Sequence, residues 1–275
     1  MSKFWTRIPI WLKAILICIP LLMGVVISAL VELNLEVILP SVPWSLIAVG
    51  MISWLYWRFT TGQAMPFPAS QTRKELSKFY PVAKELRSST VTASIMLFVM
   101  TCSLLITGFS LADYSNINMA TTLQRFNQPP AYMAILLFLG IALVAGVVEE
   151  ITFRGYMQTM MTERYGILFS FIFIAFLFAI VHGLPAMLLV PYMIISIGYS
   201  LLAQHSESII PPVITHVIVD FGFFLLAYLG VIKVDEIVMY DVFSDGISTT
   251  FAFSLSMAVM SALLLWFICS KKVSS

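Results

Sequence analysis

Charged residues are scarce in this chain: Asp, Glu, Lys and Arg make up only 11% of its 275 residues, against about 25% in soluble globular domains. Hydrophobic residues make up 60%, and the mean hydropathy of +0.97 is that of an integral membrane protein. The apolar runs are long and continuous, which favours membrane-spanning helices over a transmembrane β-barrel with its short alternating segments. The net charge of +1 gives no reason to expect a nucleic-acid partner.

Cysteine is also scarce. The three cysteines each lie inside an apolar run and show neither a disulfide framework nor the CxxC spacing of a metal site. The chain contains no GxSxG nucleophile motif and no HExxH zinc motif. Three hydroxyl residues within apolar runs are interpreted as helix contacts rather than as nucleophiles: Thr152, Ser196 and Ser200.

The apolar runs predict an all-α, polytopic helical bundle of about eight transmembrane helices in a single membrane domain over residues 1–275. The first run follows basic residues, as in a signal peptide, but it is long and lacks a clear cleavage site, so we interpret it as an uncleaved span. The predicted spans are Ile8–Leu30, Val42–Trp57, Val91–Ala112, Met133–Met157, Ile167–Val181, Pro185–Ala203, Ile209–Gly230 and Ile247–Ser270.

Basic residues gather in alternate loops, whereas the other loops hold only Arg125 and Lys233 beside several acidic residues. Because Lys and Arg stay on the cytoplasmic side, eight spans predict that both termini are cytoplasmic. The loop 61–89 is then cytoplasmic, and its segment Gln71–Ser88 is predicted to form an amphipathic helix at the membrane surface. The basic loop residues are Lys3, Arg7, Lys13, Arg58, Arg73, Lys74, Lys78, Lys84, Arg87, Arg164, Lys271 and Lys272.

Three charged residues, Glu149, Glu150 and Arg154, interrupt the apolar run Met133–Met157. Each costs roughly 2.5–3.5 kcal/mol at mid-membrane unless it pairs or faces water. Residues four apart share a helix face, so Glu150 and Arg154 can pair, while Glu149 points about 100° away. Glu149 is therefore free to face a cavity as a general base. The alternative is that all three form a structural polar knot.

Two histidine motifs follow in later apolar runs. Phe178 precedes His182 by one helical turn and can form an apolar wall beside its imidazole. Asp220 follows His216 by one turn, so the pair can hydrogen-bond or ligate a metal. Both histidines could equally be satisfied helix-packing residues. His205, in the polar stretch Gln204–Ser208, is interpreted as a loop residue.

In this order and spacing, the three motifs resemble the CPBP family of intramembrane endopeptidases, which includes type II CAAX prenyl proteases and the bacterial Abi and bacteriocin-processing proteins. The family signature of Glu-Glu-x-x-x-Arg, Phe-x-x-x-His and His-x-x-x-Asn or Asp corresponds to Glu149–Arg154, Phe178–His182 and His216–Asp220. The resemblance covers about Leu137 to Leu229, within a motif-bearing core of about 131–230.

The resemblance implies a role for each residue of the motifs. Glu149 is the general base, His182 helps to hold the attacking water, and His216 stabilises the oxyanion. Glu150 and Arg154 form a supporting pair. Asp220 stands where many relatives have Asn, and an ionised Asp would repel an oxyanion. It is therefore either protonated in its apolar site or orients His216 from behind.

The resemblance further implies a membrane-associated peptide or protein substrate and a multi-pass protein of the bacterial inner membrane. No cofactor is expected, and the alternative is a zinc ion bound by Glu149, His182, His216 and Asp220. Two alternatives lie outside the peptidase class. A proton-coupled transporter could use the same intramembrane residues as a relay, although the chain has no inverted repeat. A membrane scaffold without catalytic activity would keep them for structure alone.

Overall fold

The computed structural model describes residues 9, 12–13, 16, 19–65, 69–111, 130–182, 186–231 and 246–270. Within these ranges the secondary structure is helical and no strand occurs, as the sequence predicts. The longer helices and segments are α3 (Leu22–Glu36), α4 (Trp44–Thr60), α5 (Ser70–Ser77), α6 (Arg87–Leu111), α8 (Ala131–Glu150), the π-helical segment Ile151–Met157, α9 (Gln158–Tyr165), α10 (Ile167–Val181), α11 (Ala186–Ser206), α12 (Ile210–Tyr228) and α15 (Thr249–Ser270). Two short 3₁₀ turns, Ile19–Leu21 and Lys84–Leu86, precede α3 and α6.

Five helical stretches within the described ranges are long and apolar enough to cross a membrane: Lys84–Ser110, Ala131–Tyr165, Leu188–Ser206, Ile210–Tyr228 and Thr249–Ser270. The protein is therefore a multi-pass membrane protein. α3, α4 and α10 are shorter, with 15, 17 and 15 residues, or about 22–26 Å at 1.5 Å per residue. The count of eight spans stays a prediction. The first predicted span begins in a part of the chain that lies largely outside the described residues.

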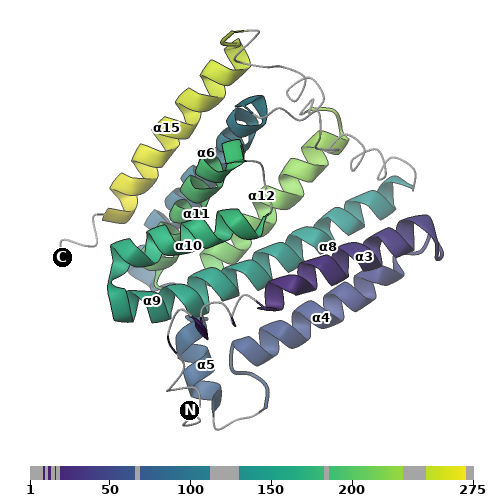
Figure 1. The fold of residues 1–275 in the computed structure, drawn as a ribbon, viewed down its shortest axis with the longest axis horizontal. Coiled ribbons are helices and arrows are strands. Elements are labelled where there is room, and N and C mark those ends of the chain that lie inside the picture. Colours follow the sequence, from purple (N-terminus) through teal and green to yellow (C-terminus); the bar gives the residue numbers. More distant parts are fainter. Residues whose placement is uncertain are drawn as a thin grey trace.

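Two groups of helices cross each other in Figure 1. α3 and α4 lie beside α8, while α6, α11, α12 and α15 form a second group that is inclined to the first. α12 packs on α8, which joins the two groups, and α10, which follows the α8 stretch in the chain, packs on α11. The motif-bearing helices therefore meet where the groups cross, whereas α15 is held on the far side of α6 by the buried cluster that includes Leu97, Met100 and Leu265.

The helix that carries the acidic pair is longer than the predicted span Met133–Met157. α8 continues through the π-helical segment and α9 as one stretch, Ala131–Tyr165, of 35 residues, about 52 Å long. Gly166, with φ of +83°, then turns the chain back into α10. Glu149 and His182 lie about equally far along the chain from Gly166. The antiparallel hairpin therefore brings them to the same level along the helix axes. Straight helices with the predicted bounds would leave them at different levels.

Two local predictions are wrong. The amphipathic helix expected over Gln71–Ser88 ends at Ser77, because Lys78 adopts a left-handed conformation (φ 51°) and Pro81 follows in a segment without regular structure. His205 is not a loop residue. It lies in the last turn of α11, is 5% exposed, and its Nε2 lies 2.9 Å from the Ser89 hydroxyl of α6.

The predicted orientation relative to the membrane stays a prediction. Both chain ends, and the loops that carry Arg125 and Lys233, lie outside the described residues. Of the basic residues in the predicted cytoplasmic loop 61–89, Arg73 is buried rather than a free surface charge. It donates hydrogen bonds to Phe59 O, at 2.7 Å, and to Ala64 O. This arginine therefore holds the end of α4 to α5.

Candidate active site

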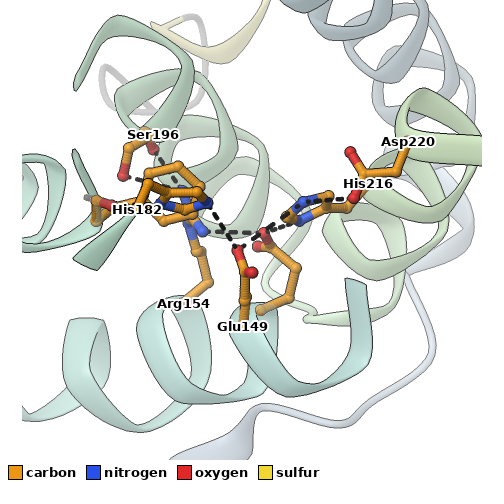
Figure 2. Close-up of polar contacts among 8 residues, drawn as sticks. Glu149, Arg154, His182, Ser196, His216 and Asp220 are labelled. Atoms are coloured by element: carbon orange, nitrogen blue, oxygen red, sulfur yellow. Dashed lines mark hydrogen bonds and ion pairs between the residues drawn. The ribbon is translucent and has the colours of Figure 1, made fainter. Parts of the chain in front are cut away.

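The buried end of α8 carries a closed cluster of charges around Glu150 (Figure 2). As the helical spacing predicts, Arg154 pairs with Glu150, with 2.9 Å between Nη1 and Oε1 and neither side chain exposed. Arg154 Nη2 also donates to Ser196 on α11, at 2.9 Å to Oγ and 3.2 Å to the carbonyl oxygen. The guanidinium lies over the rings of Phe178 and Tyr199, at 4.6 and 5.1 Å. One arginine thus joins α8 with α10 and α11.

His216 of α12 joins the same cluster. Its Nδ1 lies 2.7 Å from Glu150 Oε1 and donates to it, because a carboxylate oxygen that already accepts from Arg154 can only accept. This contact depends on Gly146, one turn before Glu150. A Cβ at Gly146 would lie 2.6 Å from a Val217 methyl and 3.1 Å from Val213 O, so only glycine lets α12 approach α8 this closely.

Glu149 lies on the other side of α8 and makes no comparable contact. Its Oε2 lies 3.8 Å from His182 Nε2 and 4.0 Å from His216 Nε2, which is too long for a direct hydrogen bond. Among the described residues this buried oxygen has no hydrogen-bond partner. Figure 2 shows Glu149 between the two imidazole rings. Three polar atoms from α8, α10 and α12 therefore face one another across a gap of water-bridging size.

His182 is held by the end of its own helix. Its Nδ1 lies 2.6 Å from Phe178 O and must carry the proton, because a carbonyl oxygen only accepts. The Phe178 ring lies 4.5 Å from the imidazole, as predicted, and the Tyr192 ring lies 5.0 Å from it. In the neutral forms of both histidines, the proton is on Nδ1. Each Nε2 then presents a lone pair towards Glu149.

A cavity of about 210 Å³ opens beside these groups, lined by Glu149, His182, His216 and Asp220 together with apolar and aromatic residues of α6, α11 and α12. Asp220 Oδ2 lies 3.5 Å from His216 Nε2, on the cavity side of the ring. Asp220 thus approaches the nitrogen that also faces Glu149, and the choice between the two alternatives for its role stays a prediction. The group behind the ring is Glu150, because the α8–α12 packing brings its carboxylate to Nδ1.

Several residues of the site are missed by reasoning from the sequence. The sequence predicts that Ser196 makes a helix contact, which its hydrogen bond to Arg154 confirms, but the choice of Arg154 as partner depends on how α11 packs. Tyr192 and Tyr199, also on α11, line the cavity, and the ring of Tyr199 lies 5.0 Å from that of His216. The only sequence signal was their spacing, since Tyr192, Ser196 and Tyr199 recur at intervals that share one helix face.

The nitrogen and oxygen atoms around the cavity are of types that zinc accepts. Within the part of the chain that the structure describes, no group of three or more His, Cys, Asp or Glu side chains is arranged to hold a metal ion. The nearest approaches, from 3.5 Å for Asp220–His216 to 4.0 Å for Glu149–His216, would have to shorten for zinc to contact these donors at once.

Comparison with known families agrees with this geometry. Residues 131–222 match the family described as type II CAAX prenyl endopeptidase Rce1-like. They comprise about a third of the chain and contain all three motifs. No curated protein and no solved structure matches the chain.

The match confirms the resemblance that the motifs suggested. The matched family is one of endopeptidases, which are hydrolases, and the match is consistent with a substrate associated with the lipid bilayer. The matched region begins with α8 and ends within α12, so Glu149, His182, His216 and Asp220 all belong to it. α3, α4, α6 and α15 lie outside it, yet α6 lines its cavity through Thr101, Leu105 and Phe109.

Proposed function

We propose that the protein is an intramembrane endopeptidase that hydrolyses a peptide bond of a membrane-associated protein or peptide. The observation that carries this proposal is the environment of Glu149. Its carboxylate oxygen lies between two imidazole nitrogens at 3.8 and 4.0 Å, on the wall of a cavity, with no protein hydrogen bond among the described residues. A water bound between these groups would be correctly placed to lose a proton to Glu149.

In the proposed reaction, Glu149 takes a proton from this water while His182 Nε2 accepts the water's other proton in a hydrogen bond. The resulting hydroxide attacks the carbonyl carbon of the scissile bond. The proton on Glu149 then passes to the leaving amine, which restores the carboxylate. Glu150 and Arg154 lie in the fully buried cluster on the side of α8 away from the cavity. There they fix the end of α8 and the ring of His216.

Asp220 is assigned a supporting role towards His216. Since His216 Nδ1 already donates to Glu150, the ring can donate to an oxyanion only through a second proton, on Nε2. Glu150 and Asp220 flank the ring on opposite sides, at 2.7 and 3.5 Å, and two carboxylates favour the imidazolium form. Asp220 would thus stabilise the oxyanion through His216 rather than by contacting it, which removes the repulsion expected for direct contact.

The donor types allow one variant of this proposal, in which zinc would bind the same four residues and would activate the water. The orientation proposed for both variants has both termini and loop 61–89 on the cytoplasmic side of a bacterial inner membrane, in accord with the basic residues of that loop.

A cleavage assay tests the proposal. Purified protein in nanodiscs is given quenched fluorescent peptides with a membrane anchor, and wild type is compared with Glu149→Gln and His182→Ala. Cleavage by wild type that both substitutions abolish, and that persists after chelation, supports the metal-free reaction. Loss on chelation and recovery with zinc supports the zinc variant. Full activity of Glu149→Gln would refute both.

A further inference from the structure

A second cavity reaches the Glu149–His182 pair from another direction. It has a volume of about 510 Å³ and shares Glu149 and His182 with the 210 Å³ cavity, but neither His216 nor Asp220 lines it. Its other boundary is α3, which Figure 1 shows beside α8. The proposed reactive pair therefore lies where a small polar cavity meets a larger one.

The wall of the larger cavity is apolar except at this pair. We call it the α3–α8 groove. Besides Glu149 and His182, its lining residues are Leu21, Gly24, Ile27, Ile141, Val144, Ala145, Val148 and Val181. A peptide bond has chain on both sides, and the larger cavity is the second space that Glu149 and His182 line. The larger groove can therefore hold the part of an extended substrate that lies on one side of the scissile bond.

Gly24 is the lining residue of this groove that has no side chain. It is exposed, and a Cβ built on it would meet no atom of the described residues within 4 Å. By contrast, Gly146, Gly155 and Gly198 are each crowded by a neighbouring helix. Gly24 therefore has no packing role that demands glycine. The absence of a side chain leaves space in the groove instead.

We propose that the α3–α8 groove binds apolar side chains of the substrate next to the scissile bond, and that Gly24 admits large ones. This inference rests on the proposed function. A substrate that arrives from lipid gains little from burying apolar surface, because lipid chains are equally apolar. Recognition in the groove then depends on van der Waals fit, so the groove selects by size and shape.

The first experiment fills the groove. Gly24→Leu is compared with Gly50→Leu on α4. Gly50 is also exposed, and within the described part of the chain no atom lies within 4 Å of a Cβ built on it. It borders a separate apolar groove that contains no residue of the site. Two peptide series carry Phe or Ala on either side of the scissile bond. We expect Gly24→Leu to lower the Phe-to-Ala ratio of kcat/KM about tenfold or more on one side. Gly50→Leu should leave the ratio unchanged, and equal ratios in both variants would overturn the proposal.

The second experiment measures binding without relying on cleavage. Gly24→Cys and Gly50→Cys are placed in a background where Cys18, Cys102 and Cys269 are alanine, and the rate of maleimide labelling is followed. The Phe peptide should slow labelling at position 24 several-fold more than the Ala peptide does, with no effect at position 50. Equal slowing at both positions would indicate a general effect of the peptide on the lipid and would overturn the groove proposal. The absence of slowing at either position would overturn it as well. If wild type cleaves no peptide but position 24 is protected, the hydrolytic proposal alone fails.

Discussion

Glu149 and Glu150 are neighbours in the chain, yet they face two different regions of the molecule. Glu150 has no exposed side-chain surface and accepts from Arg154 at 2.9 Å and His216 at 2.7 Å through one oxygen. Glu149 is 21% exposed, and the nearest imidazole nitrogens are 3.8 and 4.0 Å away. The difference teaches that environment, rather than residue type, decides which carboxylate holds the helices together and which is available for chemistry.

The two sides of α8 also differ in what surrounds them. On the closed side, Arg154 is held by Glu150, Ser196 and two aromatic rings, in a region without exposed surface. On the open side, His182 and Asp220 are about a quarter exposed and line the cavity with Glu149. Substitutions on the closed side should therefore affect stability first, and substitutions on the open side should affect catalysis first.

The largest expected effect is the loss of activity in Glu149→Gln. The amide keeps the shape of the side chain but cannot accept a proton from water, and loss of a general base typically costs about 10²–10⁴-fold in rate. The midpoint of thermal unfolding in nanodiscs should stay close to that of wild type, because no hydrogen bond to Glu149 Oε2 is lost. A large loss of stability in Glu149→Gln would contradict the view that Glu150 is the structural carboxylate and Glu149 the reactive one.

Arg154→Met should instead lower stability. Methionine fills a similar volume but leaves Glu150 as a buried carboxylate without its cation, and breaking a buried ion pair in this way costs about 3–5 kcal/mol. Unfolding of the purified protein by denaturant, followed by tryptophan fluorescence, measures the change. The double substitution Arg154→Met with Glu150→Gln serves as the control, since it removes both charges and should recover part of the loss. If the double variant recovers none of the lost unfolding free energy, Arg154 and Glu150 do not stabilise the protein as an ion pair.

Helical periodicity is sufficient to predict the Glu150–Arg154 pair, because both residues lie on one helix and their spacing fixes the contact. The bond from His216 to Glu150 depends on the crossing of α8 and α12. Its one sequence signal is Gly146, where any side chain would collide with α12. The extension of the acidic helix through a π-helical segment to Tyr165 has no pattern in the sequence, and it decides the level at which His182 meets Glu149.

The bounds of the helices show the same difference between features set within one helix and features set by contacts between helices. Apolar runs predict α10 to the residue and α12 to within two residues, because each is a single uninterrupted helix. The sequence predicts a loop position for His205 because it lies in a polar stretch near a chain reversal. Its burial depends instead on the contact with Ser89 of α6. Contacts within one helix could be predicted, and contacts between helices distant in sequence could not.

Substitution of Asp220, on the open side, should have a smaller effect on activity. In Asp220→Asn the carboxylate that flanks His216 is lost, but the amide can itself donate a hydrogen bond to an oxyanion. We therefore expect kcat/KM to remain within about tenfold of wild type, whereas Asp220→Leu, which can do neither, should lose about 10²-fold. Equal activity of the Asn and Leu variants in the peptide cleavage assay would show that Asp220 does not assist the oxyanion site.

The smallest effect should come from Ser196→Ala on the closed side. The Ser196 hydroxyl accepts from Arg154 Nη2 at 2.9 Å, but the Ser196 carbonyl, at 3.2 Å, remains as an acceptor after the substitution. We expect a loss of about 1–2 kcal/mol in unfolding free energy and nearly unchanged kcat/KM. Ser200→Ala is the matched control, because it lies one turn later on α11 and its buried hydroxyl has no hydrogen-bond partner among the described residues. If Ser196→Ala lowered catalysis far more than stability, the closed side would take part in the reaction, and the division of labour between Glu149 and Glu150 would not hold.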